Sequence, residues 1–263
     1  MKKLKILLSA YACEPNKVSE PEVGWQWALN LSKEGHDVYV ITRANNRRTI
    51  DSYKKKKKLN INFIYFDFPN WVLKIISRRG KRNPLSFIYF YLWQVGIYFY
   101  VKPYIKKIKF DYIHHVTLAT FRYPSFLSFL NVPFIYGPIG GGETAPMLLR
   151  KDFTFTEKLI DYFRDLGNHY CKFSPLINLT YLNSYKIFAT TKESKKIIPS
   201  IYHKKTEVLL AVATDDFKIK KKKFPKKKFR ICFAGRLLSW KGLHIILEAY
   251  ELITKNAKIH HLQ

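Results

Sequence analysis

The feature that most constrains the fold is an alternation of short apolar stretches with amphipathic stretches over the first 212 residues. Each apolar stretch has the length of a buried strand, and most are separated by segments with helical periodicity. We expect strands at 4–10, 37–42, 61–66, 110–114, 132–136, 185–189 and 207–210. We expect helices at 22–34, 47–57, 85–101 and within 156–182. The alternation predicts an α/β fold, a Rossmann-like parallel sheet with helices on both faces.

A sheet of this kind binds ligands at the carboxyl ends of its strands. The loops after Ala10, His114 and Tyr136 are therefore the candidate sites of this part of the chain. A nicotinamide-dependent oxidoreductase would need the spacing G-x-G-x-x-G after the first strand, and the loop after Ala10 lacks it. The sequence therefore argues against that class of Rossmann protein.

A change in composition divides the chain after residue 212. Residues 213–228 have no periodicity, and eight of the eleven residues 218–228 are lysine. We interpret 213–228 as a linker between an N-terminal domain, 1–212, and a second segment, 229–263. This segment has the pattern of a strand starting at Phe229, a loop and a helix, the first β-α unit of a second Rossmann-like domain. Because the chain then stops, we expect that second domain to be incomplete.

The loop of the second segment carries two cations beside the start of the expected helix. Gly235 permits a tight exit from the strand, and Ser239 is a suitable N-cap. Arg236 and Lys241 would add positive charge to the free N–H groups of the helix terminus. This combination suits a diphosphate, although spacing alone equally allows two solvent-exposed bases.

The net charge of the chain is +28, from 47 basic and 19 acidic residues. Much of the excess lies in runs, such as the five lysines at 54–58. Runs of this kind are most often solvated helix ends or linkers. They also favour an anionic membrane surface, whereas no nucleic-acid-binding motif accompanies the charge.

Three further features concern the compartment. The three cysteines lie far apart without the spacing of metal ligands, which is typical of free thiols in a reducing cytosol. The apolar stretch at the N-terminus is too short for a signal peptide. The uncharged stretch 85–101 is too short to span a membrane, so we expect a helix packed in the fold with one face at a membrane interface.

Several segments together resemble a known family. They are ILLSAYACEPNKVSEPEVGWQWALNLSKEGHDVYVITR near the N-terminus, DYIHHVT, YGPIGGGETAP, YKIFATTKES and, near the C-terminus, GRLLSWKG. In this order they resemble the retaining glycosyltransferase family 4, whose members have two Rossmann-like domains in the GT-B arrangement. The resemblance covers essentially the whole chain, with the second domain truncated.

The resemblance implies a hexosyltransferase that moves a sugar from a nucleoside-diphosphate sugar to a cell-surface glycan or lipid-linked acceptor. It implies retention of anomeric configuration, no cofactor and no metal. Arg236 and Lys241 match the residues that bind the donor diphosphate, and their charge would stabilise the leaving group. Gly24 matches a glycine whose backbone approaches the donor phosphate, or alternatively serves close packing of helix on strand.

The remaining site residues are implied on the acceptor side of the cleft. His114 and His115 match the position of a histidine that contacts the donor sugar. Since adjacent strand residues point to opposite faces, only one can face the cleft, and we favour His115. The glycines at 140–142 would form a flexible wall of the cleft or a plain tight loop. Glu143 would contact the acceptor, and Arg122 would meet an anionic acceptor or lie on the surface.

One departure from the family pattern opens an alternative function. The family carries a pair of glutamates eight positions apart in its second domain, and no such pair follows Lys241. The chain would then be a non-catalytic acceptor-binding fragment of such an enzyme. In either case we expect a cytoplasmic protein, peripheral at the inner face of the cytoplasmic membrane.

Overall fold

The computed structural model describes residues 2–77, 85–143, 146–151, 153–212, 230–235, 237 and 241–256. The chain divides into two compact units. The first contains Met1–Glu143 and Gly167–Ala213, and the second contains Thr144–Leu166 and Thr214–Gln263. The expected linker, 213–228, lies outside the described residues.

The first unit is built on one parallel sheet of seven strands, so the predicted α/β fold is confirmed. The order of the strands is β3-β2-β1-β4-β5-β6-β7, and every neighbouring pair is parallel. The strands are β1 (Lys5–Ser9), β2 (Asp37–Thr42), β3 (Asn62–Tyr65), β4 (Tyr112–His115), β5 (Phe134–Ile139), β6 (Ser184–Ala189) and β7 (Thr206–Val208).

Helices connect most of these strands. The α-helices are α1 (Glu20–Lys33), α2 (Arg47–Lys57), α3 (Asn70–Ser77), α4 (Leu85–Lys107), α5 (Phe155–Phe173), α6 (Pro175–Asn183), α7 (Lys192–Ile197) and α8 (Leu243–Asn256). Short 3-10 helices are η1 (Ala44–Asn46), η2 (Phe126–Phe129), η3 (Met147–Arg150) and η4 (Ser200–Lys205). The first turn of α1 contains Pro21, which fits there because its missing N–H is not needed in the first turn.

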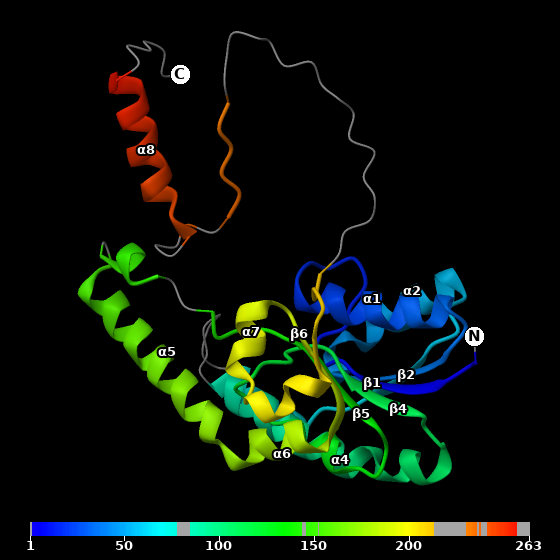
Figure 1. Cartoon of the computed structure of the whole chain (residues 1–263). Helices are drawn as coiled ribbons and strands as arrows, with labels where there is room; N and C mark the ends of the chain where they lie inside the picture. The colour runs from blue at the N-terminus through cyan, green and yellow to red at the C-terminus, as the bar shows by residue number, and fades with distance from the viewer. Residues whose placement is uncertain are drawn as a thin grey trace. The chain divides into compact units, whose positions relative to one another are not determined.

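Both faces of the sheet are covered, as a parallel sheet requires. Trp25 and Ala28 of α1 and Ile50 of α2 pack on one face. On the other face lie buried residues of α4, η2 and α6, among them Trp93 and Tyr181. Figure 1 shows α1 and α2 on one side of the strands and α4 and α6 on the other. Trp27 and Leu31 of α1 are partly buried and pack against the same cluster as Trp25.

The lysine run of α2 has a structural explanation. Lys54, Lys55, Lys56 and Lys57 form the last turn of the helix, where positive charge is favourable beside the helix dipole. Lys58 then ends the helix in the left-handed conformation, with φ of 51°. The run is therefore a helix end, the most common interpretation of such a sequence.

The aromatic helix α4 packs in the fold, as the sequence predicts. Tyr89, Trp93, Ile97 and Val101 are buried in the core. The opposite side of the helix leaves large apolar side chains exposed, including Phe99 at 62%. Among the described helices none has the length and hydropathy that a membrane span requires.

The second unit has helices but no strand in its described residues. Residues 230–234, where a strand beginning at Phe229 was expected, are not in a strand, and Phe229 itself is outside the described part. A strand needs a partner for its backbone groups, and the described residues of this unit offer none. The expected helix is present as α8, which starts at Leu243; Ser239, its expected N-cap, is outside the described residues.

Candidate functional site

The carboxyl ends of β1 and β4 lie side by side at the position where the strand order reverses. In open α/β sheets this position forms the ligand-binding crevice. The two loops that follow are joined, because the N–H of Ala12 donates to Oγ1 of Thr117 over 3.1 Å. The N–H of Leu118 donates to Oε2 of Glu20 at the start of α1, over 2.9 Å. Leu118 has a φ of 52°, so this bond holds an otherwise unfavourable backbone conformation.

Gly24 brings α1 against these loops. A Cβ at this position would lie 2.2 Å from the carbonyl oxygen of Ala12 and 3.0 Å from Cγ2 of Thr117. The residue is buried in the second turn of α1 rather than at its first residue. The geometry therefore explains Gly24 by close packing of helix on loop, the alternative that the sequence left open. A contact with a donor phosphate stays a prediction.

His115 has both ring nitrogens engaged by the protein. Its Nε2 lies 3.1 Å from the carbonyl oxygen of Thr117 and must donate there, so Nδ1 accepts from the hydroxyl of Ser125 over 2.9 Å. The ring lies 5.4 Å from that of Tyr136 and is 2% exposed. No ring nitrogen of His115 is left for a ligand, which revises the preference for this histidine.

His114 points to the opposite face of the sheet, toward α1. Its Nε2 donates to the carbonyl oxygen of Gly137 over 2.8 Å, which fixes the neutral tautomer with a bare Nδ1. That Nδ1 has no hydrogen bond to the described part of the chain. The ring stacks edge-on against Trp27 at 4.8 Å. Of the two histidines, His114 is the one with an acceptor atom to spare.

Burial keeps both histidines neutral near pH 7. Loss of solvent lowers the pKa of His114 to about 4, and the bond to Gly137 opposes this only partly. The pKa of His115 is also lowered to about 4, mainly by burial. A neutral imidazole can accept a hydrogen bond from a sugar hydroxyl but supplies no positive charge.

Glu143 belongs to the support of α7. Its Oε1 accepts from the hydroxyls of Thr191, over 3.1 Å, and Ser194. Burial would raise the pKa of this carboxyl, but hydrogen bonds from Ser194 and Thr191 and from backbone N–H groups outweigh it and lower the pKa. The charged Glu143 thus holds the loop before α7, and contact with an acceptor stays a prediction.

The glycine turn is tight rather than flexible. The N–H of Gly140 donates to the carbonyl oxygen of Ala119 over 3.0 Å. Gly142 has a φ of 84°, and a Cβ there would lie 2.2 Å from Cδ1 of Ile197 and 2.8 Å from Cε1 of Phe121. Of the two interpretations of residues 140–142, the structure therefore supports a tight, closely packed loop rather than a flexible wall.

Arg122 is exposed and bonded to an amide rather than to an acid. Its Nε and Nη2 donate to Oδ1 of Asn168 over 2.9 and 2.7 Å. The guanidinium also lies over the ring of Phe121, 5.2 Å from its centroid. No carboxylate of the described residues forms an ion pair with it, and its role toward an anionic acceptor stays a prediction.

The donor-diphosphate pair belongs to the second unit. Lys241 is exposed and precedes Gly242, which has a φ of 71°, and the start of α8. Arg236 lies outside the described residues. The predicted pairing of these two cations on a diphosphate therefore remains a prediction. Among the described residues, no group of three or more His, Cys, Asp or Glu side chains is placed to hold a metal ion.

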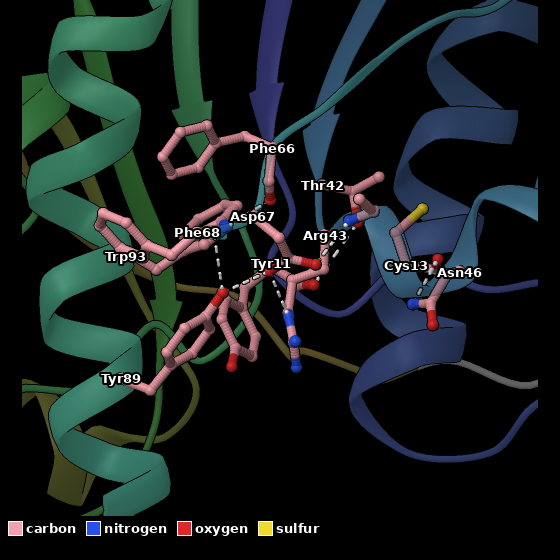
Figure 2. A network of polar contacts seen from close by, with 11 residues as sticks. Tyr11, Cys13, Thr42, Arg43, Asn46, Phe66, Asp67, Phe68, Tyr89 and Trp93 are labelled. Atoms are coloured by element: carbon pink, nitrogen blue, oxygen red, sulfur yellow. Dashed lines mark hydrogen bonds and ion pairs between the residues drawn. The ribbon is translucent and has the colours of Figure 1, made fainter. Parts of the chain in front are cut away.

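Sequence reasoning missed a second polar cluster, at the carboxyl ends of β1, β2 and β3. Nε of Arg43 donates to Oδ1 of Asp67 over 2.9 Å, and the guanidinium lies 5.3 Å from the ring centroid of Tyr11 and 4.9 Å from that of Tyr89. Figure 2 shows these four side chains gathered in one network. The signal was present, because Tyr11, Arg43 and Asp67 each follow a strand within two residues.

A pocket of about 320 Å³ opens beside this cluster. Arg43 and Lys74 line it with positive charge, Tyr11 and Tyr89 line it with rings, and Asn70 and Ser86 add polar groups. A hollow of about 480 Å³ lies beside the lysine-rich end of α2, but it is lined by residues of that helix and of Leu59–Asn60 rather than by strand ends. We therefore regard the pocket at Arg43 as the second candidate site.

Comparisons with known proteins give distant similarities only. No protein-family model matches the sequence, and no curated protein matches it. One similar solved structure is a glycosyltransferase from Rickettsia africae ESF-5, with 15% identity, a TM-score of 0.38, and coverage of 80% of this chain and 43% of that one. Another is UGT73P12 of Glycyrrhiza uralensis, complexed with glycyrrhetinic acid 3-O-monoglucuronide, with 14% identity, a TM-score of 0.43, and coverage of 80% and 48%. This chain thus spans less than half the length of either.

Proposed function

We propose that this chain is the acceptor-side part of a retaining glycosyltransferase that uses a nucleoside-diphosphate sugar. The observation that carries the proposal is where the resembling segments lie. The segment 6–43 forms β1, α1 and β2, while DYIHHVT contains β4. YGPIGGGETAP continues from β5, and YKIFATTKES contains most of β6. Since β1, β4, β5 and β6 are consecutive neighbours in the sheet, their carboxyl ends form one edge.

The role proposed for His114 is supported by the geometry of this edge, and the roles of Arg236 and Lys241 rest on the resemblance. His114 would accept a hydrogen bond from a sugar hydroxyl at its bare Nδ1, while Gly137 holds the ring in place through Nε2. Arg236 and Lys241 would bind the diphosphate and stabilise the negative charge of the leaving nucleoside diphosphate. The reaction would need no metal, because these cations take its place. The acceptor would be a cell-surface glycan or a lipid-linked sugar.

The test is sugar transfer in the presence of bacterial-type lipid acceptors, with radiolabelled UDP- and GDP-sugars as donors. Arg236→Ala and Lys241→Ala should each lower kcat/KM by at least about a hundredfold, because each removes charge stabilisation made in the transition state. Lys255→Ala is the matched control, since Lys255 lies near the other end of α8 and pairs with Glu251. Full activity in both the Arg236 and Lys241 variants would refute the diphosphate assignment.

The alternative is a chain that binds the acceptor but does not transfer sugar. It would apply if this chain lacks a complete nucleotide-binding domain. Titration with UDP-glucose and GDP-mannose distinguishes the two. Micromolar donor binding supports the enzyme, whereas millimolar or undetectable binding together with acceptor binding supports the alternative.

A further inference from the structure

The pocket beside Arg43 is separate from the crevice between β1 and β4. Its lining residues follow β1 and β2 or belong to α3 and α4. Tyr11 follows Ala10 in a loop that the sequence marked as a candidate site, but none of the individually predicted catalytic, donor or acceptor residues lines the pocket. A set of charged and aromatic groups converging on a concave surface is typical of a ligand site.

Asp67 acts as an anchor within this cluster. Its two oxygens accept from Nε of Arg43, from the N–H of Ala44 over 2.9 Å, and from the hydroxyl of Tyr89. The Asp67 side chain is only 7% exposed. With three donors already bound, the carboxylate serves to orient Arg43 rather than to receive a ligand.

The guanidinium of Arg43 is bonded to Asp67 through Nε, while its side chain remains partly exposed. Within the described residues, Nε of Arg43 donates to Oδ1 of Asp67, and the side chain also lies close to the hydroxyl of Tyr11. The guanidinium lies 5.3 Å from the ring centroid of Tyr11 and 4.9 Å from that of Tyr89, and Figure 2 shows the three side chains beside one another. Tyr11 is itself fixed by edge-on contacts with Phe90 at 5.1 Å and Trp93 at 5.0 Å. The two terminal nitrogens therefore form a preoriented pair of donors.

A purely structural ion pair would be expected to look different. An arginine that only neutralises a carboxylate commonly uses two parallel N–H bonds, and here Asp67 takes one. The 21% exposure of the Arg43 side chain leaves it reachable from solvent, while Asp67 is shielded. Lys74 also lines the pocket, so two of its lining residues are cationic. The arrangement thus favours an anion.

We propose that this pocket binds the phosphate group of a phosphorylated sugar, through the two terminal nitrogens of Arg43. A guanidinium presents its paired donors in the geometry that phosphate oxygens accept. The rings of Tyr11 and Tyr89 supply apolar walls for the sugar, and Asn70 and Ser86 supply polar groups for its hydroxyls. The proposal deepens the proposed function and rests on it in one step only, that the phosphorylated sugar is the acceptor.

The test is calorimetric titration of the full chain with glucose 1-phosphate and with inorganic pyrophosphate, at an ionic strength of about 0.15 M to screen diffuse charge. Arg43→Gln and Arg43→Lys should each weaken binding about tenfold or more. The lysine variant keeps the charge beside Asp67 and removes only the paired donors. Arg47→Gln is the matched control, because Arg47 is exposed, lies over Tyr65 and does not line the pocket.

Each outcome decides the assignment. Loss of binding in both Arg43 variants, with Arg47→Gln unchanged, supports the pocket. The assignment is overturned if Arg43→Lys binds as tightly as the wild type, or if Arg47→Gln loses as much affinity as the Arg43 variants. It is also overturned if the wild-type chain binds neither of the two probes nor the vesicles described next. Thermal unfolding of each variant shows whether it is folded.

Two sources of the phosphate are distinguished by a second titration. Phosphatidylcholine vesicles carrying a polyprenyl-phosphate-linked glucose represent the lipid-linked source, and vesicles with phosphatidylglycerol instead control for surface charge. Arg43-dependent binding to the first vesicles identifies a lipid phosphate, and Arg43-dependent binding only to glucose 1-phosphate identifies a soluble one. Arg43-dependent phosphate binding without any sugar transfer would leave the pocket assigned and would refute sugar transfer by this chain, in favour of the acceptor-binding alternative.

Discussion

His114 and His115 are neighbours in β4, and the alternation of a strand sends their rings to opposite faces. On one face, His115 is closed off by Ser125 and Thr117. On the other face, His114 keeps one nitrogen without a bond to the described residues. The pattern of residues alone could establish that one histidine faces the crevice. Only the placement of the hydrogen-bond partners could indicate which one.

The lowered pKa values predict how stability depends on pH. An unfolded histidine has a pKa near 6.5, whereas each of these two titrates at about 4 in the folded chain. Between these values the unfolded state binds more protons, so the free energy of unfolding decreases as pH falls from 6.5 to 4 and is fully present above 6.5. Each histidine should account for about 3 kcal/mol of that loss.

Urea unfolding at pH 7.5, 6 and 5 measures this effect. The slope of the unfolding free energy with pH should be shallower in His114→Gln and in His115→Gln than in the wild type. His169→Gln, an exposed position on α5, is the control and should keep the wild-type slope. An unchanged slope in both buried variants would show that these histidines do not govern acid destabilisation.

At the scale of elements, Gly24 sets how closely α1 approaches the loops after β1 and β4. In Gly24→Ala the new methyl group would overlap the backbone oxygen of Ala12, which cannot move away as a side chain tip could. We expect a loss of about 1–3 kcal/mol in the free energy of unfolding, typical of overpacking. Chemical unfolding of the purified variant measures this loss.

Gly167→Ala is the matched control for this substitution. Gly167 also lies inside a helix, α5, but nothing surrounds the position of its Cβ within 4 Å. Alanine should therefore stabilise the chain there by up to about 1 kcal/mol, because it favours the helix. If Gly24→Ala were as stable as Gly167→Ala, the close approach of α1 would not be a constraint.

Most elements of the first unit could be predicted from the sequence because each depends on a local pattern. An apolar run of strand length, such as the one in β2, gives a strand wherever partners flank it on both sides. The same reasoning was wrong at residues 230–234, where the apolar run is present and a partner strand is not among the described residues. Strand formation thus depends on neighbours that a local pattern does not contain.

Some residues of the candidate sites could be predicted from local sequence patterns, and others could not. Arg43 and Asp67 could have been found from the rule that ligand-binding residues follow the carboxyl ends of parallel strands. Arg43 directly follows β2, and Asp67 lies two residues after β3. The role of Glu143 could not have been found in this way, because it depends on contact with Thr191 and Ser194, 48 and 51 residues further along the chain. Long-range contacts of this kind become visible only when the fold is known.

For the whole molecule, the positive charge and the exposed side of α4 suggest a membrane surface as a partner. Phe87, Ile88, Leu92 and Phe99 are exposed on this helix. Near its end, Lys102 lies 4.3 Å from the ring centroid of Tyr98 and 5.3 Å from that of Phe99. Aromatic residues beside lysines are typical of helices that lie at the interface of anionic lipids.

This arrangement predicts a localised rather than a diffuse attraction. Replacing Lys102, Lys106 and Lys107 of α4 with glutamine should weaken binding to phosphatidylglycerol vesicles by about a hundredfold, at about 1 kcal/mol for each lysine near the surface. Replacing Lys55, Lys56 and Lys57 of α2 removes the same charge from a helix end without the exposed aromatic side chains. The affinity of that control variant for the vesicles should stay close to the affinity of the wild type. Equal weakening of both variants in vesicle co-sedimentation would mean that net charge alone drives binding, and no binding by the wild-type chain would exclude α4 as a membrane contact.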